Sequence, residues 1–222
     1  MRNVVITGVG IKSCIGNSYQ EVLDSLKNGK SGISADETHK EMGFRSQVSG
    51  SIDLNFSELI DRKLYRFMGE SAAYAYLAAQ DAIKMAGISE LDLSSDKTGI
   101  VAGSGGASTR VMVNTADITR EKGPKRIGPY AVTKSMGSSI SAILGTAFKL
   151  KGINYSISSA CATSAHCIGH GADLIKSGQQ DIVLAGGGED LHWSSSSLFD
   201  AMGALSSNFN DNPSSASRAY DK

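Results

Sequence analysis

The sequence has little cysteine and little proline, and each shortage excludes a class of protein. Its 222 residues contain three cysteines, Cys14, Cys161 and Cys167, an odd number that is too sparse for a disulfide framework. No two of them have the Cys-x-x-Cys spacing that suggests a zinc site. With 3 prolines and 41% apolar residues, the composition excludes a disordered or fibrous chain and indicates a folded globular one.

The chain also lacks an excess of charge of either sign and lacks a long apolar run. Its 22 basic residues balance 22 acidic ones, so no overall field attracts nucleic acid or an acidic membrane, and a charged partner must be met by a local patch. No apolar run reaches the ~18 residues of a membrane-spanning helix. We therefore expect a cytoplasmic protein with free thiols that binds neither nucleic acid nor membrane.

Glycine is abundant instead, and its placement indicates the fold class. The 25 glycines gather after short apolar runs at residues 4–7, 100–102 and 182–185. Strands that end in tight turns give this pattern, and apolar runs without alternation are typical of strands covered on both faces. The sequence therefore predicts a layered α/β domain, and it shows no internal repeat and no linker.

Four helices are predicted around these strands. The first follows Ser18, which begins a capping-box sequence, and stops at Gly29. The second covers 70–86 and ends at Gly87, where a left-handed C-cap favours glycine. The other two are expected at 130–144 and 162–176.

The segment that carries chemistry leads into the last of these helices. Residues 154–160 alternate like a strand and run directly into Cys161. The N-terminus of a helix presents unpaired N–H groups and the positive end of the helix dipole, and both favour a thiolate. Cys161 is therefore a candidate nucleophile, and the alternative is an inert cysteine of the core.

Cysteine nucleophiles usually work with a histidine, but the spacing here does not supply one. At ~100° per residue, His166 lies about 140° and His170 about 180° around the helix from Cys161. These two histidines stand four residues apart, as a metal pair would, yet no glutamate accompanies them, and we interpret them as structural. His39 and His192 lie in no catalytic motif, so we expect no metal site.

The glycine-rich turns do not form a cofactor-binding motif. Gly8 and Gly10 are followed by the next glycine only at Gly16, which misses the dinucleotide fingerprint. A phosphate-binding loop of the form Gly-x-x-x-x-Gly-Lys-[Ser/Thr] does not occur. We therefore expect no cofactor.

The sequence around Cys161 resembles a known nucleophile motif. Residues 158–166, Ser-Ser-Ala-Cys-Ala-Thr-Ser-Ala-His, are similar to that of the 3-oxoacyl-[acyl-carrier-protein] synthases, and Ser164 with Ala165 favours their type I branch. The resemblance extends along the chain in order, through residues 4–10, 103–106, 128–134, 185–189 and 199–206.

The resemblance implies a thiolase-like fold of two similar halves. It is α/β, layered as α-β-α-β-α in the complete enzyme, which is usually a homodimer. Residues 1–222 would form the N-terminal β-ketoacyl synthase domain with its mixed sheet, and the chain is expected to stop before the C-terminal half. In the family that half carries two catalytic histidines, so this fragment alone is predicted to be inactive.

The resemblance also implies a reaction, the decarboxylative Claisen condensation of fatty acid elongation. Cys161 would accept an acyl chain from acyl carrier protein, and a carbanion from malonyl-acyl carrier protein would attack it to give 3-oxoacyl-acyl carrier protein. Gly106 would line the acyl pocket. Thr133 would lie near the dimer interface, and Met136 would close the end of the partner's pocket.

The resemblance implies a partner for two clusters of basic residues, because acyl carrier protein is acidic. Lys63 and Arg66 are expected to contact it, with Lys122 and Lys125 as a second set. Taken by themselves, such clusters are usually solvated surface.

Three other functions remain open at this point. The first is a thiolase-like acyltransferase that uses coenzyme A in place of carrier protein. The second is a non-catalytic half-subunit that needs a separate histidine-bearing chain. The third is a hydrolase in which His39 or His192 approaches Cys161.

Overall fold

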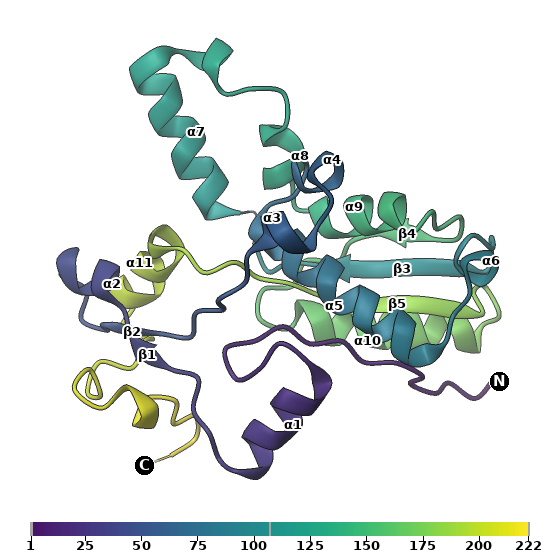
Figure 1. Ribbon diagram of the computed structural model, residues 1–222, viewed down its shortest axis with the longest axis horizontal. Helices are drawn as coiled ribbons and strands as arrows, with labels where there is room; N and C mark the ends of the chain where they lie inside the picture. Colours follow the sequence, from purple (N-terminus) through teal and green to yellow (C-terminus); the bar gives the residue numbers. More distant parts are fainter. Residues whose placement is uncertain (1, 107, 222) are drawn as a thin grey trace. The chain divides into compact units, whose positions relative to one another are not determined.

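The chain divides into two compact units, each described here by itself. The structure is a computed structural model that describes residues 2–106 and 108–221 (Figure 1). The first unit is Met1–Gly10 with Asn55–Asp190, and the second unit is Ile11–Leu54 with Leu191–Lys222. Cys161 belongs to the first unit.

A parallel three-stranded sheet forms the centre of the first unit. Its order is β4 (Asn154–Tyr155), β3 (Thr98–Gly103) and β5 (Ile182–Gly187), and β3 pairs in parallel with both neighbours. All six residues of β3 are buried, as expected for a strand covered on both faces. The predicted strands at 100–102 and 182–185 are thereby confirmed.

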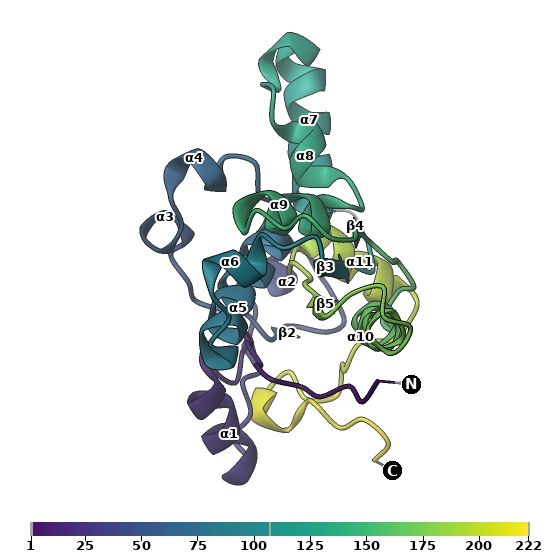
Figure 2. The same ribbon diagram turned by 90° about the vertical axis from the view of Figure 1, so that its right-hand side faces the viewer.

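Helices cover both faces of this sheet. α5 (Glu70–Ala86) and α9 (Ser139–Ala147) lie on one face, and α10 (Thr163–Lys176) lies on the other (Figures 1 and 2). On the α10 side, Val101 of β3 packs with Cys167 and Leu174 in a buried cluster. The result is a layered α/β arrangement, as the sequence predicts.

One long helix of the first unit stands apart from these layers. α7 (Thr109–Lys122) extends away from the sheet in both views (Figures 1 and 2) and has no buried residue. An ion pair of 3.3 Å between Arg110 Nη2 and Glu70 Oε2 ties its base to α5. The shorter helices of this unit are α3 (Phe56–Leu59), α4 (Arg62–Tyr65), α6 (Glu90–Leu93), the 3₁₀ turn η1 (Pro124–Arg126) and α8 (Ala131–Ser135).

The second unit combines helices with a small antiparallel sheet. The Asp200 carboxylate accepts hydrogen bonds from the backbone N–H groups of Ser46 (2.9 Å) and Arg45 (3.2 Å), and these bonds hold the pKa of Asp200 below its usual value. The elements are α1 (Tyr19–Lys27), β1 (Ser34–Ala35), α2 (Glu37–Glu41), β2 (Val48–Ser49), α11 (Trp193–Ala201) and η2 (Pro213–Ser215).

Two predicted helices form as expected, with their caps. Ser18 Oγ accepts from the N–H of Glu21 at 3.3 Å, and the Glu21 carboxylate accepts in return from the N–H of Asn17 at 2.7 Å. α5 ends at Gly87, whose φ of 66° is left-handed. Local capping chemistry therefore determines both elements.

The predicted strand at 4–7 is wrong. Those residues belong to no strand, and the side chains of Val5 and Ile6 are 72% and 82% exposed. Instead of pairing with a strand, the segment runs onto α5, where Gly8 and Gly10 approach the backbone at Ala82 and Ala78. A methyl group at either glycine would overlap a carbonyl oxygen of the helix, so the glycines serve close approach and not a turn.

The predicted helix at 130–144 is also wrong, because the chain breaks it in two. Met136 is extended (ψ 145°) and separates α8 from α9. The Ser139 hydroxyl donates to the carbonyl oxygen of Thr133 at 2.7 Å across this break. A side chain thus satisfies a backbone acceptor that a continuous helix would have satisfied.

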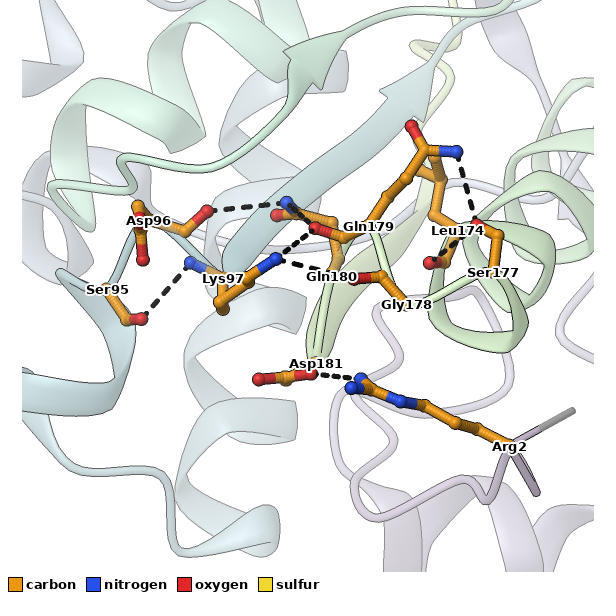
Figure 3. A network of polar contacts seen from close by, with 10 residues as sticks. All are labelled: Arg2, Ser95, Asp96, Lys97, Leu174, Ser177, Gly178, Gln179, Gln180 and Asp181. Carbon is orange, nitrogen blue, oxygen red and sulfur yellow. Dashed lines mark hydrogen bonds and ion pairs between the residues drawn. The ribbon is translucent and has the colours of Figure 1, made fainter.

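A polar network fixes the amino ends of β3 and β5 (Figure 3). The buried Gln180 side chain accepts from the N–H of Ile153 (3.3 Å) and donates to the carbonyl oxygen of Asp96 (3.3 Å). Lys97 Nζ donates to the carbonyl oxygens of Gly178 and Gln179, both at 3.4 Å, and Arg2 pairs with Asp181 (Figure 3). These contacts leave the opposite edge of the sheet available for a site.

None of the helices in residues 2–106 and 108–221 combines the length and the apolar character needed to cross a bilayer.

The close approach at Gly10 gives a stability prediction. Gly10→Ala should lower the free energy of unfolding by about 3 kcal/mol, because the new methyl group must push the segment off the α5 backbone. Urea unfolding measures this. The control is Gly137→Ala, where a methyl group meets open space and the change should stay within about 0.5 kcal/mol. Equal midpoints for the two variants would contradict the packing described here.

Candidate functional site

Cys161 lies at a sharp bend between the end of the sheet and α10. The preceding Ala160 has a left-handed backbone (φ 51°), which a residue with a side chain rarely adopts. Ala162 is the N-cap of α10 and Thr163 its first residue, so Cys161 stands one residue before the cap. The Cys161 side chain is exposed. The expected position at the junction is confirmed, although the strand itself ends earlier, at Tyr155.

A buried threonine holds the bend in place. Thr163 Oγ1 donates to the carbonyl oxygen of Ala160 at 2.8 Å and accepts from the N–H of Ser159 at 2.9 Å. The N–H of Ala162 also donates to the carbonyl oxygen of Ser159 at 3.1 Å. One hydroxyl therefore bonds to both sides of the strained residue, which stabilises the conformation that presents Cys161.

The glycine-rich segment after β3 lies beside this bend. Ser158 Oγ donates to the carbonyl oxygen of Ser104 at 3.1 Å, and a methyl group at Gly105 would stand 3.0 Å from the carbonyl oxygen of Ala160. The Glu189 carboxylate accepts from Ser104 Oγ at 2.8 Å and from the N–H of Gly105. Three segments thus meet where the parallel strands end, the edge at which α/β sheets commonly bind ligands.

Gly106, expected to line an acyl pocket, has no neighbour where a side chain would be. A methyl group built on it meets nothing within 4 Å. Its carbonyl oxygen accepts from Ser104 Oγ at 2.7 Å, which ties it to the segment beside Cys161. The side-chain position of Gly106 is therefore open, and the expected acyl pocket stays a prediction.

The histidines of α10 bond to other side chains. His166 Nδ1 lies 2.6 Å from Ser159 Oγ, and His170 Nε2 makes a hydrogen bond with the Tyr155 hydroxyl. Each ring is therefore bonded to a hydroxyl of the segment that leads into α10, Ser159 for His166 and Tyr155 for His170. Within residues 2–106 and 108–221, no three histidine, cysteine, aspartate or glutamate side chains form a group that could hold a metal ion.

His39 and His192 belong to the second unit and have partners within it. The buried His39 ring stacks on Phe44, with centroids 4.5 Å apart, and His192 Nδ1 lies 2.7 Å from Ser194 Oγ, at the cap of α11. Each of the two rings therefore has a contact within its own unit.

The three thiols have different surroundings. Cys161 is exposed, Cys14 is half-buried and Cys167 is buried. Burial raises the pKa of the Cys167 thiol, since a thiolate there would lose its hydration. Accessibility therefore separates Cys161 from the other two.

Lys63 and Arg66 lie together on the surface, beside an aromatic ring. A hollow of about 470 Å³ is lined by Arg62, Lys63, Arg66 and Tyr130. Asp61 begins α4 by accepting from the N–H of Lys63 at 2.8 Å, and this short helix places Arg62 and Arg66, four residues apart, on one side. The first basic cluster is thus a local surface of three cations.

Lys122 and Lys125 lie elsewhere, and neither lines this hollow. Lys122 is at the end of α7, with its Nζ 3.9 Å from a carboxylate oxygen of Glu121. Lys125 belongs to the turn η1 that follows. Part of the charge of the second set is therefore compensated by its own neighbour.

Thr133 and Met136 lie at the end of α8 and at the break after it. Thr133 Oγ1 donates to the carbonyl oxygen of Tyr130 at 2.9 Å, and the N–H of Met136 donates to that of Val132 at 3.0 Å. The hydrogen bonds described for these two residues are local to the α8–α9 segment and do not reach Cys161.

Several residues of the site carry no sequence signal of their own. Thr163 and Glu189 occur within the motifs but gain a role only through contacts with Ala160 and Gly105. Arg62 belongs to the same basic run as Lys63 and Arg66, and its four-residue spacing from Arg66 indicates that the two arginines share one side of a helix. Nothing in the sequence brings Tyr130 to this run.

Comparison with known proteins identifies the arrangement. The protein-family model described as "Beta-ketoacyl synthase, N-terminal domain" matches residues 1–222. The 3-oxoacyl-[acyl-carrier-protein] synthase 1 of Haemophilus influenzae is 56% identical over 222 residues, which is 100% of this chain and 55% of the relative. That of Escherichia coli is 53% identical over 223 residues, with the same coverage. The chain therefore spans about half the length of the curated relatives it matches.

Solved structures give the same result. A β-ketoacyl synthase from Burkholderia phymatum, 26% identical, superposes with a TM-score of 0.87 over 96% of this chain and 53% of its own. A type II polyketide ketosynthase in complex with its acyl-carrier protein, 25% identical, superposes with a TM-score of 0.76 over 93% of this chain and 50% of its own. The fold is therefore the thiolase-like fold of these synthases.

The exposure of the thiols predicts an order of alkylation. On the native chain at neutral pH, a thiol-directed reagent should modify Cys161 first and Cys14 more slowly, and Cys167 should stay unmodified because it is buried and its pKa is raised. Peptide mass spectrometry follows each site over time. In denaturant the three rates should converge. Equal rates on the native chain would remove the case for Cys161.

Proposed function

The chain belongs to the β-ketoacyl synthase family, and on this premise we propose that Cys161 is the nucleophile that takes up an acyl chain in the synthesis of 3-oxoacyl thioesters. The observation that carries the proposal is an exposed thiol on a strained bend, held one residue before the cap of a 14-residue helix. A helix of that length directs its N–H groups and its dipole toward the developing negative charge.

In the first step, the sulfur of Cys161 attacks the thioester carbonyl of an acyl chain carried on the phosphopantetheine arm of acyl carrier protein. A new C–S bond forms, the carbonyl oxygen becomes an oxyanion, and collapse releases the carrier's thiolate and leaves an acyl-cysteine. The backbone N–H of Cys161 is the proposed oxyanion donor. The Thr163 bonds that fix the bend keep that N–H and the sulfur in one geometry.

In the second step, malonyl-acyl carrier protein loses carbon dioxide, and its carbanion forms a C–C bond with the acyl carbonyl carbon on Cys161. The C–S bond to Cys161 then breaks, which releases the product and regenerates the thiolate. The product is a 3-oxoacyl chain two carbons longer. The four histidines of this chain have structural partners at Ser159, Tyr155, Phe44 and Ser194. We therefore propose that decarboxylation needs histidines outside these 222 residues, and that the chain by itself is acylated but does not condense.

The acyl chain is proposed to lie against Gly106, where the space beside the backbone is open. Thr133 and Met136 are proposed at a homodimer interface, with Met136 closing the pocket of the partner subunit. Support comes from α7, which extends away from the sheet (Figure 1) and has no buried residue, and from the exposed apolar residues Met112 on α7 and Val132 on α8.

The proposed partner is acyl carrier protein, in its acyl and malonyl forms, and the proposed location is the cytoplasm. Lys63 and Arg66 offer cations at the hollow of α4, with Lys122 and Lys125 as a second contact. An acidic partner would be attracted by such a patch even though the chain has no net charge. A solved relative that is a ketosynthase in complex with its acyl-carrier protein supports this choice over coenzyme A.

Acylation without condensation is the direct test. The 222-residue chain, incubated with an acyl-acyl carrier protein, should gain one acyl group on Cys161, detected by peptide mass spectrometry. Cys161→Ser should abolish the adduct, and the matched variants Cys14→Ser and Cys167→Ser should keep it. With malonyl-acyl carrier protein labelled in the carboxyl carbon, no labelled carbon dioxide should appear. Sustained release, or an adduct on another residue, would refute the assignment.

The carrier-protein surface gives a second test. Lys63→Glu with Arg66→Glu should weaken carrier-protein binding by on the order of tenfold at low ionic strength, and the loss should shrink as salt screens the charges. Isothermal titration measures the affinity. Lys149→Glu with Lys151→Glu makes the same change in net charge at other exposed residues and serves as the control. If both double variants bind alike, Lys63 and Arg66 are solvated surface only.

A further inference from the structure

The hollow at α4 is built from two segments that are distant in the sequence. Arg62, Lys63 and Arg66 come from the four-residue helix α4 and its C-cap. Tyr130, the N-cap residue of α8, supplies the fourth side chain. Three cations therefore surround a single tyrosine ring, which is half-buried while the cations are exposed.

Arg66 is the cation that this ring holds. Its guanidinium carbon lies 5.3 Å from the centroid of Tyr130 and 5.0 Å from that of Phe67. The two rings meet edge to face, with centroids 4.9 Å apart and an interplanar angle of 77°. Both distances are within the range of a cation–π interaction, so Arg66 has a fixed place although it is exposed.

The charges at the hollow are not neutralised within the described part of the chain. None of Arg62, Lys63 and Arg66 makes an ion pair with a carboxylate of residues 2–106 or 108–221. Other arginines contrast with them, since Arg45 pairs with Asp200 and Arg120 with Asp117. An aromatic face orients a guanidinium without cancelling its charge, so the N–H groups of Arg66 can still donate to an anion.

We propose that Tyr130 is a positioning residue for carrier-protein docking, which holds the Arg66 guanidinium at the mouth of the hollow so that it meets an acidic side chain of the partner already oriented. This inference rests on the proposed carrier-protein surface and adds a residue to it. An unrestrained arginine side chain loses conformational entropy when it docks, and this loss weakens binding. Because the ring already restricts the Arg66 side chain before binding, part of this entropy loss no longer occurs on docking. Tyr130 therefore affects the affinity only by way of Arg66.

Two substitutions separate the ring face from the rest of the tyrosine. Tyr130→Leu keeps apolar volume against Phe67 but removes the aromatic face, and Tyr130→Phe keeps the face but removes the hydroxyl. Binding of acyl carrier protein to the full chain at low salt should weaken roughly three- to fivefold in Tyr130→Leu and stay unchanged in Tyr130→Phe. Leu91→Ala, at an exposed apolar residue of α6 that belongs to no proposed surface, is the control and should also bind unchanged.

The decisive comparison is a double-mutant cycle. If Tyr130 acts through Arg66, Tyr130→Leu in an Arg66→Ala background should cause no further loss of affinity. A further loss of the same three- to fivefold size would mean that the ring contacts the carrier protein itself and would overturn the positioning role. Equal weakening in Tyr130→Phe and Tyr130→Leu would also overturn it, because the hydroxyl would then be the active group.

A measurement on the chain alone distinguishes this inference from the proposed function. In nuclear magnetic resonance spectra, ring currents should displace the chemical shifts of the Arg66 side-chain protons from their usual values. This displacement should persist in Tyr130→Phe and become smaller in Tyr130→Leu. No displacement in the native chain refutes the positioning of Arg66. Displacement as expected, together with carrier binding that is insensitive to Lys63→Glu with Arg66→Glu, refutes the carrier-protein surface and with it the docking role.

Discussion

The site depends on one backbone constraint, the left-handed turn at Ala160. An alanine in that region is strained by about 1–2 kcal/mol, and the conformation persists because Thr163 bonds to both Ser159 and Ala160. The strain has a structural result. It turns the chain into the N-cap of α10 within two residues, and the thiol of Cys161 between Ala160 and that cap stays exposed, while Thr163, Cys167 and Gly171 of the helix are buried.

The two ends of the strands in the parallel sheet have different roles. At the amino ends of β3 and β5, Gln180 and Lys97 satisfy backbone carbonyl groups and close the edge with hydrogen bonds. At the carboxyl ends, the strands open into glycine-rich segments, which Glu189 and Ser158 hold beside the bend. β3 is buried along its whole length between these edges, and a packed strand of this kind suits a nucleophile that must be aligned before the substrate arrives.

Elements set by local rules could be predicted from the sequence. The strand at β3, the helix α5 with its Gly87 cap, and the position of Cys161 all follow from patterns within a few residues. Elements set by distant contacts could not. Residues 4–7 have the composition of a strand but pair with no strand of residues 2–106 and 108–221, and the 130–144 pattern does not reveal that Ser139 will bond to Thr133. Glu189 and Tyr130 escaped prediction for the same reason, since their partners lie far along the chain.

The cationic residues illustrate how structure selects among equivalent sequence signals. Lys63, Arg66, Lys122 and Lys125 are equivalent cations in the sequence. Lys122 lies beside the Glu121 carboxylate, whereas Arg66 lies against two aromatic rings and makes no ion pair within the part of the chain that the structure describes. A neighbouring carboxylate partly neutralises the charge of a cationic side chain. An aromatic ring leaves that charge available to a partner and restricts the movement of the side chain. A helix of four residues cannot by itself order a long side chain on its surface. The ring from α8 supplies that order, so the surface depends on a contact between segments in the way that the bend at Ala160 depends on Thr163.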